Sequence, residues 1–208
     1  TKCRVEVHRF FGPHEATRTT VLRELMLRTW DVLHFAGHCA YDRKNPPASG
    51  WVFTHGERIT ARELSRLDRI PRFVFSNACE SGVTPDRAEQ RSLDLAPSFA
   101  ESFFQRGVAN FVCTAWPVDD VAARQFAIEL YGRLLGIDAH GPTRLSPMFE
   151  AMKHARRRVA ETAREDGAPA GGARTWGAYQ HYGNPFSHLF DEAALTRQRE
   201  EIRGKSGL

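Results

Sequence analysis

Hydrophobic residues in this chain gather in short runs, separated by polar stretches and by segments with helical spacing. Three compact runs lie at residues 31–36, 72–79 and 109–116. Runs of this length predict strands that are buried on both faces. Because helical segments alternate with these runs, we predict an α/β protein with a mostly parallel sheet covered by helices on both faces.

Weaker patterns predict the rest of the architecture. Alternating apolar and polar positions indicate a first strand at residues 3–11, and turn residues separate two short strands that form a β-hairpin. The remaining elements are expected in this order: a helix at 16–27, hairpin strands at 51–54 and 58–60, helices at 61–67, 96–106, 121–135 and 146–164, and a last strand within the aromatic segment 176–190.

Two predicted helices begin at capping residues. Thr60 followed by Glu63 is a capping-box pattern, in which each side chain accepts a hydrogen bond from the other residue's backbone N–H. Asp119 and Asp120 precede the helix at 121–135, where a carboxylate can accept from the first free N–H groups. We therefore expect helices to start at these positions.

Composition fits one globular domain. The 208 residues are 41% hydrophobic and 26% charged, and neither a long apolar span nor a signal-peptide pattern occurs. The four cysteines lack CxxC spacing, which suits reduced thiols better than disulfides or a zinc site. We therefore expect a soluble cytoplasmic protein that needs no metal or cofactor.

A mild basic excess is concentrated in one predicted helix. The formal net charge is +4, and the local excess comes from Lys153, Arg156, Arg157 and Arg158. Such a cluster is usually a solvated helix face. No zinc motif, Gly-rich phosphate loop or aromatic platform accompanies it, so we do not expect direct contact with nucleic acid.

Reactive side chains end two of the compact runs. His38 follows the run at 31–36, and Cys79 ends the run at 72–79. A parallel sheet brings the carboxyl ends of its strands to one edge, where these residues would meet. A thiolate attacks an amide, and an imidazole can accept the thiol proton and later protonate the leaving amine. The pattern favours a cysteine peptidase over the ordinary alternative of a buried thiol and a core histidine.

Other thiols and imidazoles have structural interpretations. No third catalytic group is apparent, so we expect a dyad. His34 shares a strand face with His38 but lies inside the apolar run, which favours a hydrogen-bonded interior residue. Cys3 and Cys113 lie within predicted strands and are expected to be inert.

Several ordered segments carry a resemblance to a known family. They are DVLHFAGHCAYD, FVFSNACESG, ANFVCTAWPVDD, FAIELYGRLL and WGAYQHYGNP. Together they resemble the CHAT family of caspase-like peptidases, which is related to caspases, separases, gingipains and legumains. The resemblance implies a caspase-like three-layer αβα sandwich over residues 1–190, a first strand upstream of Thr1, and a charged tail at 191–208. It also implies a longer parent protein with N-terminal tetratricopeptide repeats or another sensor.

The same resemblance implies site residues. His38 would be the catalytic histidine and Cys79 the nucleophile. The backbone N–H groups of Gly37 and Cys79 would bind the oxyanion of the tetrahedral intermediate. Cys39 stands where family members commonly have glycine or another small residue, and it places a second thiol beside the site.

The residues of the S1 pocket have two interpretations. Separases carry a similar Trp-x-Val-x-Asp segment, and matching it to WPVDD places Asp120 where a basic P1 side chain is recognised. Asp119 is an alternative, and either carboxylate could cap the following helix instead. Asp42 and Trp116 are weaker candidates for the acid and the wall of this pocket.

The function implied by the resemblance is an endopeptidase that cuts a specific protein once an N-terminal sensor is triggered. Relatives that cleave gasdermins or associate with CRISPR systems suggest bacterial defence or regulated cell death. Two alternatives stay open: a catalytically silent interaction or signalling module, and a thiol acyl-transfer enzyme such as an amidase or transpeptidase. A metal hydrolase is disfavoured, because the sequence has no HExxH motif.

Overall fold

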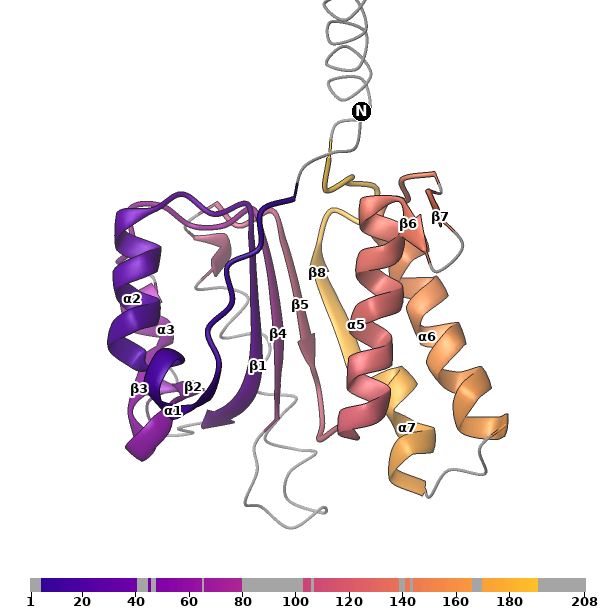
Figure 1. Cartoon of the computed structure of the whole chain (residues 1–208), viewed down its shortest axis with the longest axis horizontal. Helices are drawn as coiled ribbons and strands as arrows, with labels where there is room; N and C mark the ends of the chain where they lie inside the picture. The colour runs from indigo at the N-terminus through magenta and orange to yellow at the C-terminus, as the bar shows by residue number, and fades with distance from the viewer. Residues whose placement is uncertain are drawn as a thin grey trace, which may run out of the picture.

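The protein is a three-layer αβα sandwich, as predicted. The computed structural model describes residues 5–40, 45, 48–64, 66–79, 103–105, 107–138, 141–142, 144–165 and 170–190. Within these residues, a six-stranded sheet lies between two layers of helices (Figure 1). One face is covered by α2 (Arg18–Leu27) and α3 (Ala61–Leu64), and the other by α5 (Asp120–Leu135), α6 (Met148–Glu165) and α7 (Ala170–Ala178).

The large sheet has a parallel centre and antiparallel ends. Its strand order is β3-β2-β1-β4-β5-β8, in which β1, β4 and β5 run parallel. The strand bounds are Val32–Ala40 (β1), Gly50–Val52 (β2), Arg58–Thr60 (β3), Phe73–Cys79 (β4), Asn110–Thr114 (β5) and Tyr179–Gly183 (β8). A separate ladder joins β6 (Ile137–Asp138) to β7 (Gly141–Pro142). The carboxyl ends of β1, β4 and β5 therefore share one edge, at the bottom of Figure 1.

Side chains of β4 divide the core into two clusters. Val74 and Ala78 belong to the cluster beneath α2 and α3, whereas Phe73 and Phe75 belong to the cluster beneath α5 and α6. Burial on both faces explains why this strand is a continuous apolar run in the sequence.

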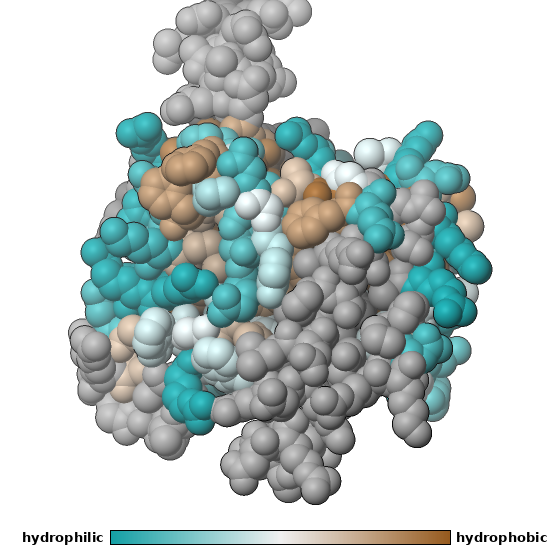
Figure 2. Space-filling view, turned by 180° about the vertical axis from the view of Figure 1, so that it is seen from behind, coloured by the Kyte–Doolittle hydropathy of each residue, from teal (hydrophilic) through white to brown (hydrophobic). Residues whose placement is uncertain are grey.

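Figure 2 shows the surface of the protein from the side opposite to Figure 1. The described residues on this side are mostly hydrophilic, with hydrophobic patches in the upper half.

Capping side chains determine where two helices begin, as the sequence predicted. The Glu63 N–H donates to Thr60 Oγ1 at 3.2 Å, and the Thr60 N–H donates to Glu63 Oε2 at 2.9 Å. At the start of α5, Asp119 Oδ1 accepts from the Ala122 N–H at 3.0 Å. Two shorter segments are α1 (Gly12–Glu15) and the 3-10 turn η2 (Thr54–Gly56). None of the helices in the described part is long and apolar enough to cross a bilayer.

The N-terminal segment differs from the prediction of a strand. Residues 5–11 have no regular secondary structure and lead directly into α1. Val5, Val7 and Phe11 are 44%, 60% and 70% exposed, so the alternating apolar positions are not buried against the sheet. A strand requires a hydrogen-bonding neighbour as well as alternation, and a local pattern does not supply one.

The end of one strand and the presence of one helix also differ from the predictions. β1 continues beyond residue 36 to Ala40, because β2 pairs with its residues 38–40. The last strand, Tyr179–Gly183, lies within the predicted segment 176–190, whereas α7, which precedes it and ends at Ala178, was not predicted. Of the helix predicted at 96–106, only residues 103–105 lie in the described part, and the first two of these are helical.

Candidate active site

The register of β1 against β4 places the two predicted catalytic residues side by side. The strands pair in parallel from Val32 opposite Phe73 to His38 opposite Cys79. Neighbouring strands lie about 4.8 Å apart, so His38 and Cys79 occupy adjacent backbone positions at the carboxyl edge of the sheet. His38 is exposed to solvent. This arrangement suits a base and a nucleophile, whose catalytic roles stay a prediction.

Gly37 precedes the histidine and pairs with Ala78 of β4. A Cβ atom at Gly37 would lie 3.0 Å from Phe35 Cζ. The Phe35 ring is itself stacked on Trp51, with ring centroids 4.7 Å apart. The missing side chain at Gly37 therefore gives room to an aromatic stack, in addition to the oxyanion role predicted for its N–H.

Side-chain hydrogen bonds hold the end of β4 in place. The Tyr179 hydroxyl donates to Asn77 Oδ1 at 3.0 Å, and Thr114 Oγ1 donates to the Ala78 carbonyl at 3.1 Å. Tyr179 is fully buried in β8. Sequence patterns did not identify this contact, because Tyr179 and Asn77 are 102 positions apart in the chain.

Two further thiols of the described residues are buried in strands. Cys39 is buried on the opposite face of β1 from His38, and its Sγ donates to the Gly50 carbonyl at 3.1 Å. Cys113 is buried in β5, and burial raises the pKa of its thiol to about 12. Cys113 is therefore buried in its strand, which disfavours its thiolate and fits the prediction of an inert thiol, whereas Cys39 is a core residue on the opposite face of β1 from His38. Cys3 lies outside the described residues.

His34 has a different environment from the one predicted. Its ring stacks on Phe75 with centroids 4.5 Å apart and lies 5.7 Å from the ring of Tyr131. Burial of the stacked side of the ring lowers the pKa of His34, while solvent reaches its remaining surface. Within the described part it makes no hydrogen bond. The prediction of a hydrogen-bonded interior histidine is therefore wrong.

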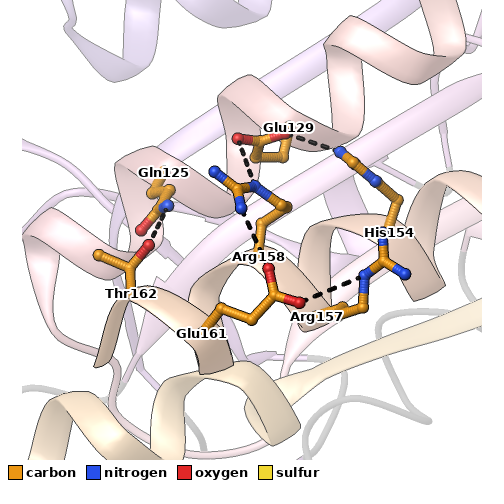
Figure 3. Close-up of polar contacts among 7 residues, drawn as sticks. All are labelled: Gln125, Glu129, His154, Arg157, Arg158, Glu161 and Thr162. Carbon is orange, nitrogen blue, oxygen red and sulfur yellow. Dashed lines mark hydrogen bonds and ion pairs between the residues drawn. The ribbon is translucent and has the colours of Figure 1, made fainter. Parts of the chain in front are cut away.

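Basic residues of α6 point in different directions. Arg157 and Arg158 are exposed, and both pair with Glu161 of the same helix (Figure 3). Arg158 Nε also lies 3.7 Å from Glu129 Oε1 of α5, so these ion pairs link α6 to α5. Arg156 is half-buried and donates instead to a backbone carbonyl of β8. The predicted solvated face is confirmed for Arg157 and Arg158 but not for Arg156.

The acidic candidates for the S1 pocket lie at the start of α5. The Asp119 carboxylate is engaged as the helix cap, and its own N–H donates to Thr175 Oγ1 at 3.2 Å. Asp120 is exposed in the first turn. Asp42 lies outside the described residues. The capping role is therefore confirmed for Asp119, and S1 recognition by Asp120 stays a prediction.

A pocket of about 510 Å³ opens beside the start of β8. Its walls come from the segment that follows β5 and from α6, α7 and β8. The lining residues are Trp116, Arg156, Arg174, Trp176, Gly177 and Gln180. Trp116 comes after the carboxyl end of β5, and Cys79 is the last residue of β4. The pocket therefore lies at the same edge of the sheet as His38 and Cys79. Asp119 and Asp120 are not among the residues that line it.

Comparisons with known proteins agree with this architecture. A family model described as the CHAT domain matches residues 5–184. The crystal structure of the Arg-specific cysteine proteinase gingipain R is similar to 82% of this chain and 35% of its own, with 13% identity and a TM-score of 0.54. A structure described only as a protease is similar to 84% of this chain and 38% of its own, with 14% identity and a TM-score of 0.50. No curated protein matches the chain. These similarities show a shared fold, and the chain spans between 35% and 38% of the length of the two structures.

Proposed function

This chain belongs to the CHAT-domain family, and we propose that it is a caspase-like cysteine endopeptidase that acts through Cys79 and His38. The observation that carries the proposal is the parallel register that pairs these two residues at the sheet edge. Gingipain R, which shares the fold, is an Arg-specific cysteine proteinase. The fold, the edge and the residue types thus support one chemistry.

In the proposed reaction, the Cys79 thiolate attacks the scissile carbonyl carbon, and His38 holds the proton taken from the thiol. Backbone N–H groups of Gly37 and Cys79 stabilise the oxyanion. When the C–N bond breaks, His38 gives its proton to the leaving amine, and an acyl-enzyme thioester remains. His38 then takes a proton from water, whose oxygen attacks the thioester, and returns a proton to the departing thiolate.

The surroundings of the pair support these roles. His38 is exposed, so a substrate can reach it. The described thiols at Cys39 and Cys113 are buried and cannot replace the nucleophile. Hydrogen bonds from Tyr179 and Thr114 hold the two residues that precede Cys79.

The activity of the whole protein is part of the proposal, because the chain spans about a third of the structures it resembles. We propose a specific protein substrate, restraint by an N-terminal sensor or repeat region, and a role in bacterial defence or regulated cell death. Recognition of a basic P1 residue by Asp120, with Asp119, Trp116 and Asp42 as further candidates, stays a prediction from the sequence.

Cleavage of a diverse peptide library tests the dyad. We expect Cys79→Ala and His38→Ala each to lower kcat by roughly a thousand-fold or more. Cys113→Ala removes a buried thiol elsewhere, and His34→Ala removes an imidazole four positions earlier on the same strand; both controls should retain activity. Cleavage that survives Cys79→Ala would contradict the proposal. Equal loss of cleavage in folded Cys113→Ala and His34→Ala would also contradict it.

The alternatives give different results in the same assay. A transferase would form an amine-linked product in preference to the acid when small amines are added. A silent module would show no Cys79-dependent turnover, even as part of its full-length parent with the triggering signal present.

A further inference from the structure

The pocket beside β8 combines positive charge with aromatic side chains. Two arginines, two tryptophans, a glutamine and a glycine line its volume of about 510 Å³. Among the described residues that line it, none is acidic. Guanidinium groups bind carboxylates through paired, charge-assisted hydrogen bonds, and indole walls suit the apolar part of a ligand. The lining therefore has the chemistry of a site for a small carboxylate-bearing group.

Arg156 is the residue that distinguishes this pocket from a solvated helix face. It donates a hydrogen bond to the Tyr179 carbonyl, and it has no acidic partner among the described residues. Its Nε–H is buried and has no acceptor in the described part of the chain. Arg156 is half-buried, and burial lowers its pKa because the charged form is partly removed from water. A carboxylate bound in the pocket would supply a counterion.

One tryptophan wall lies against the backbone of α7. A Cβ atom at Gly177 would lie 3.4 Å from Trp116 Cζ2, so the indole packs directly over the glycine backbone. The buried Trp116 Nε1–H also lacks an acceptor within the described residues. Trp176 is 48% exposed and stands at the opening of the pocket to solvent. These features give the pocket an aromatic wall, with Arg156 and Arg174 also in its lining.

The pocket lies one strand away from the predicted nucleophile. β4 and β5 pair in parallel up to Ser76 opposite Cys113. Cys79 ends β4 and Trp116 lies two residues after the end of β5, so both stand beyond that pair at the carboxyl edge of the sheet. A substrate side chain next to the scissile bond could therefore enter the pocket while its carbonyl stands at Cys79.

We propose that this pocket binds the carboxylate of an aspartate or glutamate at the P1 position of the substrate, with Arg156 and Arg174 as its cationic partners. The proposal rests on the peptidase function proposed above and specifies its substrate class. It differs from the basic P1 residue predicted through Asp120, which does not line the pocket. The Asp119 carboxylate is already held by the Ala122 N–H at 3.0 Å.

Binding to the inactive Cys79→Ala protein tests the pocket separately from catalysis. The probes are acetylated, amidated peptides that differ only at one central position, occupied by Asp, Glu, Asn, Gln, Arg or Lys. Titration is followed by calorimetry and by tryptophan fluorescence, which reports on Trp116 and Trp176. We expect the Asp or Glu peptide to bind at least about ten-fold more tightly than its amide counterpart.

Arginine variants locate the effect. Arg156→Gln and Arg174→Gln should each abolish most of the preference for the acid, whereas Arg124→Gln, at an exposed position of α5, should leave it unchanged. Arg156→Lys keeps the charge without the forked donor and should retain only part of the preference. Thermal unfolding shows whether each variant is folded, and exposed Arg174 gives a variant that spares the core.

Several outcomes would overturn the proposal. The proposal is overturned if the Asp and Asn peptides bind with equal affinity. It is also overturned if the preference for the acidic peptide survives both Arg156→Gln and Arg174→Gln. Tighter binding of the Arg or Lys peptides that is lost in Asp120→Ala would support the sequence prediction instead. A non-amidated Asn peptide supplies a free C-terminal carboxylate; if it alone binds tightly, the pocket recognises chain ends and not a P1 side chain.

Failure of the pocket and failure of the peptidase are distinguishable. Cys79-dependent cleavage after other residues would keep the peptidase and reject the acidic pocket. Arginine-dependent binding of acidic peptides without any Cys79-dependent cleavage would keep the pocket as a binding site but reject both the peptidase and the P1 role.

Discussion

A buried tyrosine and a half-buried one provide a test of how the end of β4 is held. Tyr179 and Tyr131 both pack against Phe75, with ring centroids 5.8 Å and 6.0 Å from it. The Tyr179 hydroxyl donates to Asn77 Oδ1 at 3.0 Å, whereas the Tyr131 hydroxyl is buried and has no partner in the described part of the chain. The same substitution, tyrosine to phenylalanine, should therefore have opposite consequences at the two positions.

The magnitudes follow from the hydrogen bonding of each hydroxyl. Tyr179→Phe removes a donor and leaves the half-buried Asn77 amide oxygen without it, which should cost about 1.5 kcal/mol in the free energy of unfolding. For a chain of 208 residues this corresponds to a decrease in Tm of roughly 3–6 °C. Tyr131→Phe removes an unsatisfied polar group and should leave Tm unchanged or raise it.

Denaturant and thermal unfolding of the three proteins provide the measurement. A double-mutant cycle with Asn77→Ala should give a coupling energy of about 1 kcal/mol for the Tyr179 pair and close to zero for the Tyr131 pair. A loss of stability at Tyr131→Phe as large as that at Tyr179→Phe would refute the reasoning. So would an unchanged Tm in Tyr179→Phe, because the hydrogen bond would then contribute nothing net.

Two further predictions concern stability. Burial alone would raise the pKa of Glu63, but hydrogen bonds from Thr60 and the ion pair with Arg18 outweigh it and lower that pKa below the ordinary 4.5. The contribution of ionised Glu63 to stability is therefore complete above about pH 4.5 and is lost as the pH falls through the lowered pKa of Glu63. Glu63→Gln should remove this part of the acid dependence of the free energy of unfolding. An acid profile that is unchanged in Glu63→Gln would contradict the prediction. Gly50→Ala should cost about 1–3 kcal/mol in chemical unfolding, because its Cβ would lie 2.3 Å from the Ile59 carbonyl oxygen of the paired strand; a neutral effect would show that the hairpin can shift.

Local patterns predicted much of the fold correctly. The apolar runs that became β1, β4 and β5 need no long-range information, because a strand buried on both faces is hydrophobic along its length. The capping box of Thr60 and Glu63 and the cap at Asp119 lie within single turns, so their residue types alone indicate the helix starts. The positions of His38 and Cys79 at strand ends also follow from the sequence, since parallel strands align their carboxyl ends.

What the sequence by itself determined is thus the type and order of most elements and the candidate dyad at their ends. Tertiary structure alone decided that residues 5–11 stay outside the sheet, since a strand forms only where a neighbour accepts its backbone hydrogen bonds. It also decided that Arg156 turns inward while Arg157 stays in water, although both carry the same charge in the same helix. Helix packing determines which side of a helix is covered, and here it brings Arg156 to a pocket whose other walls come from β8, α7 and the end of β5.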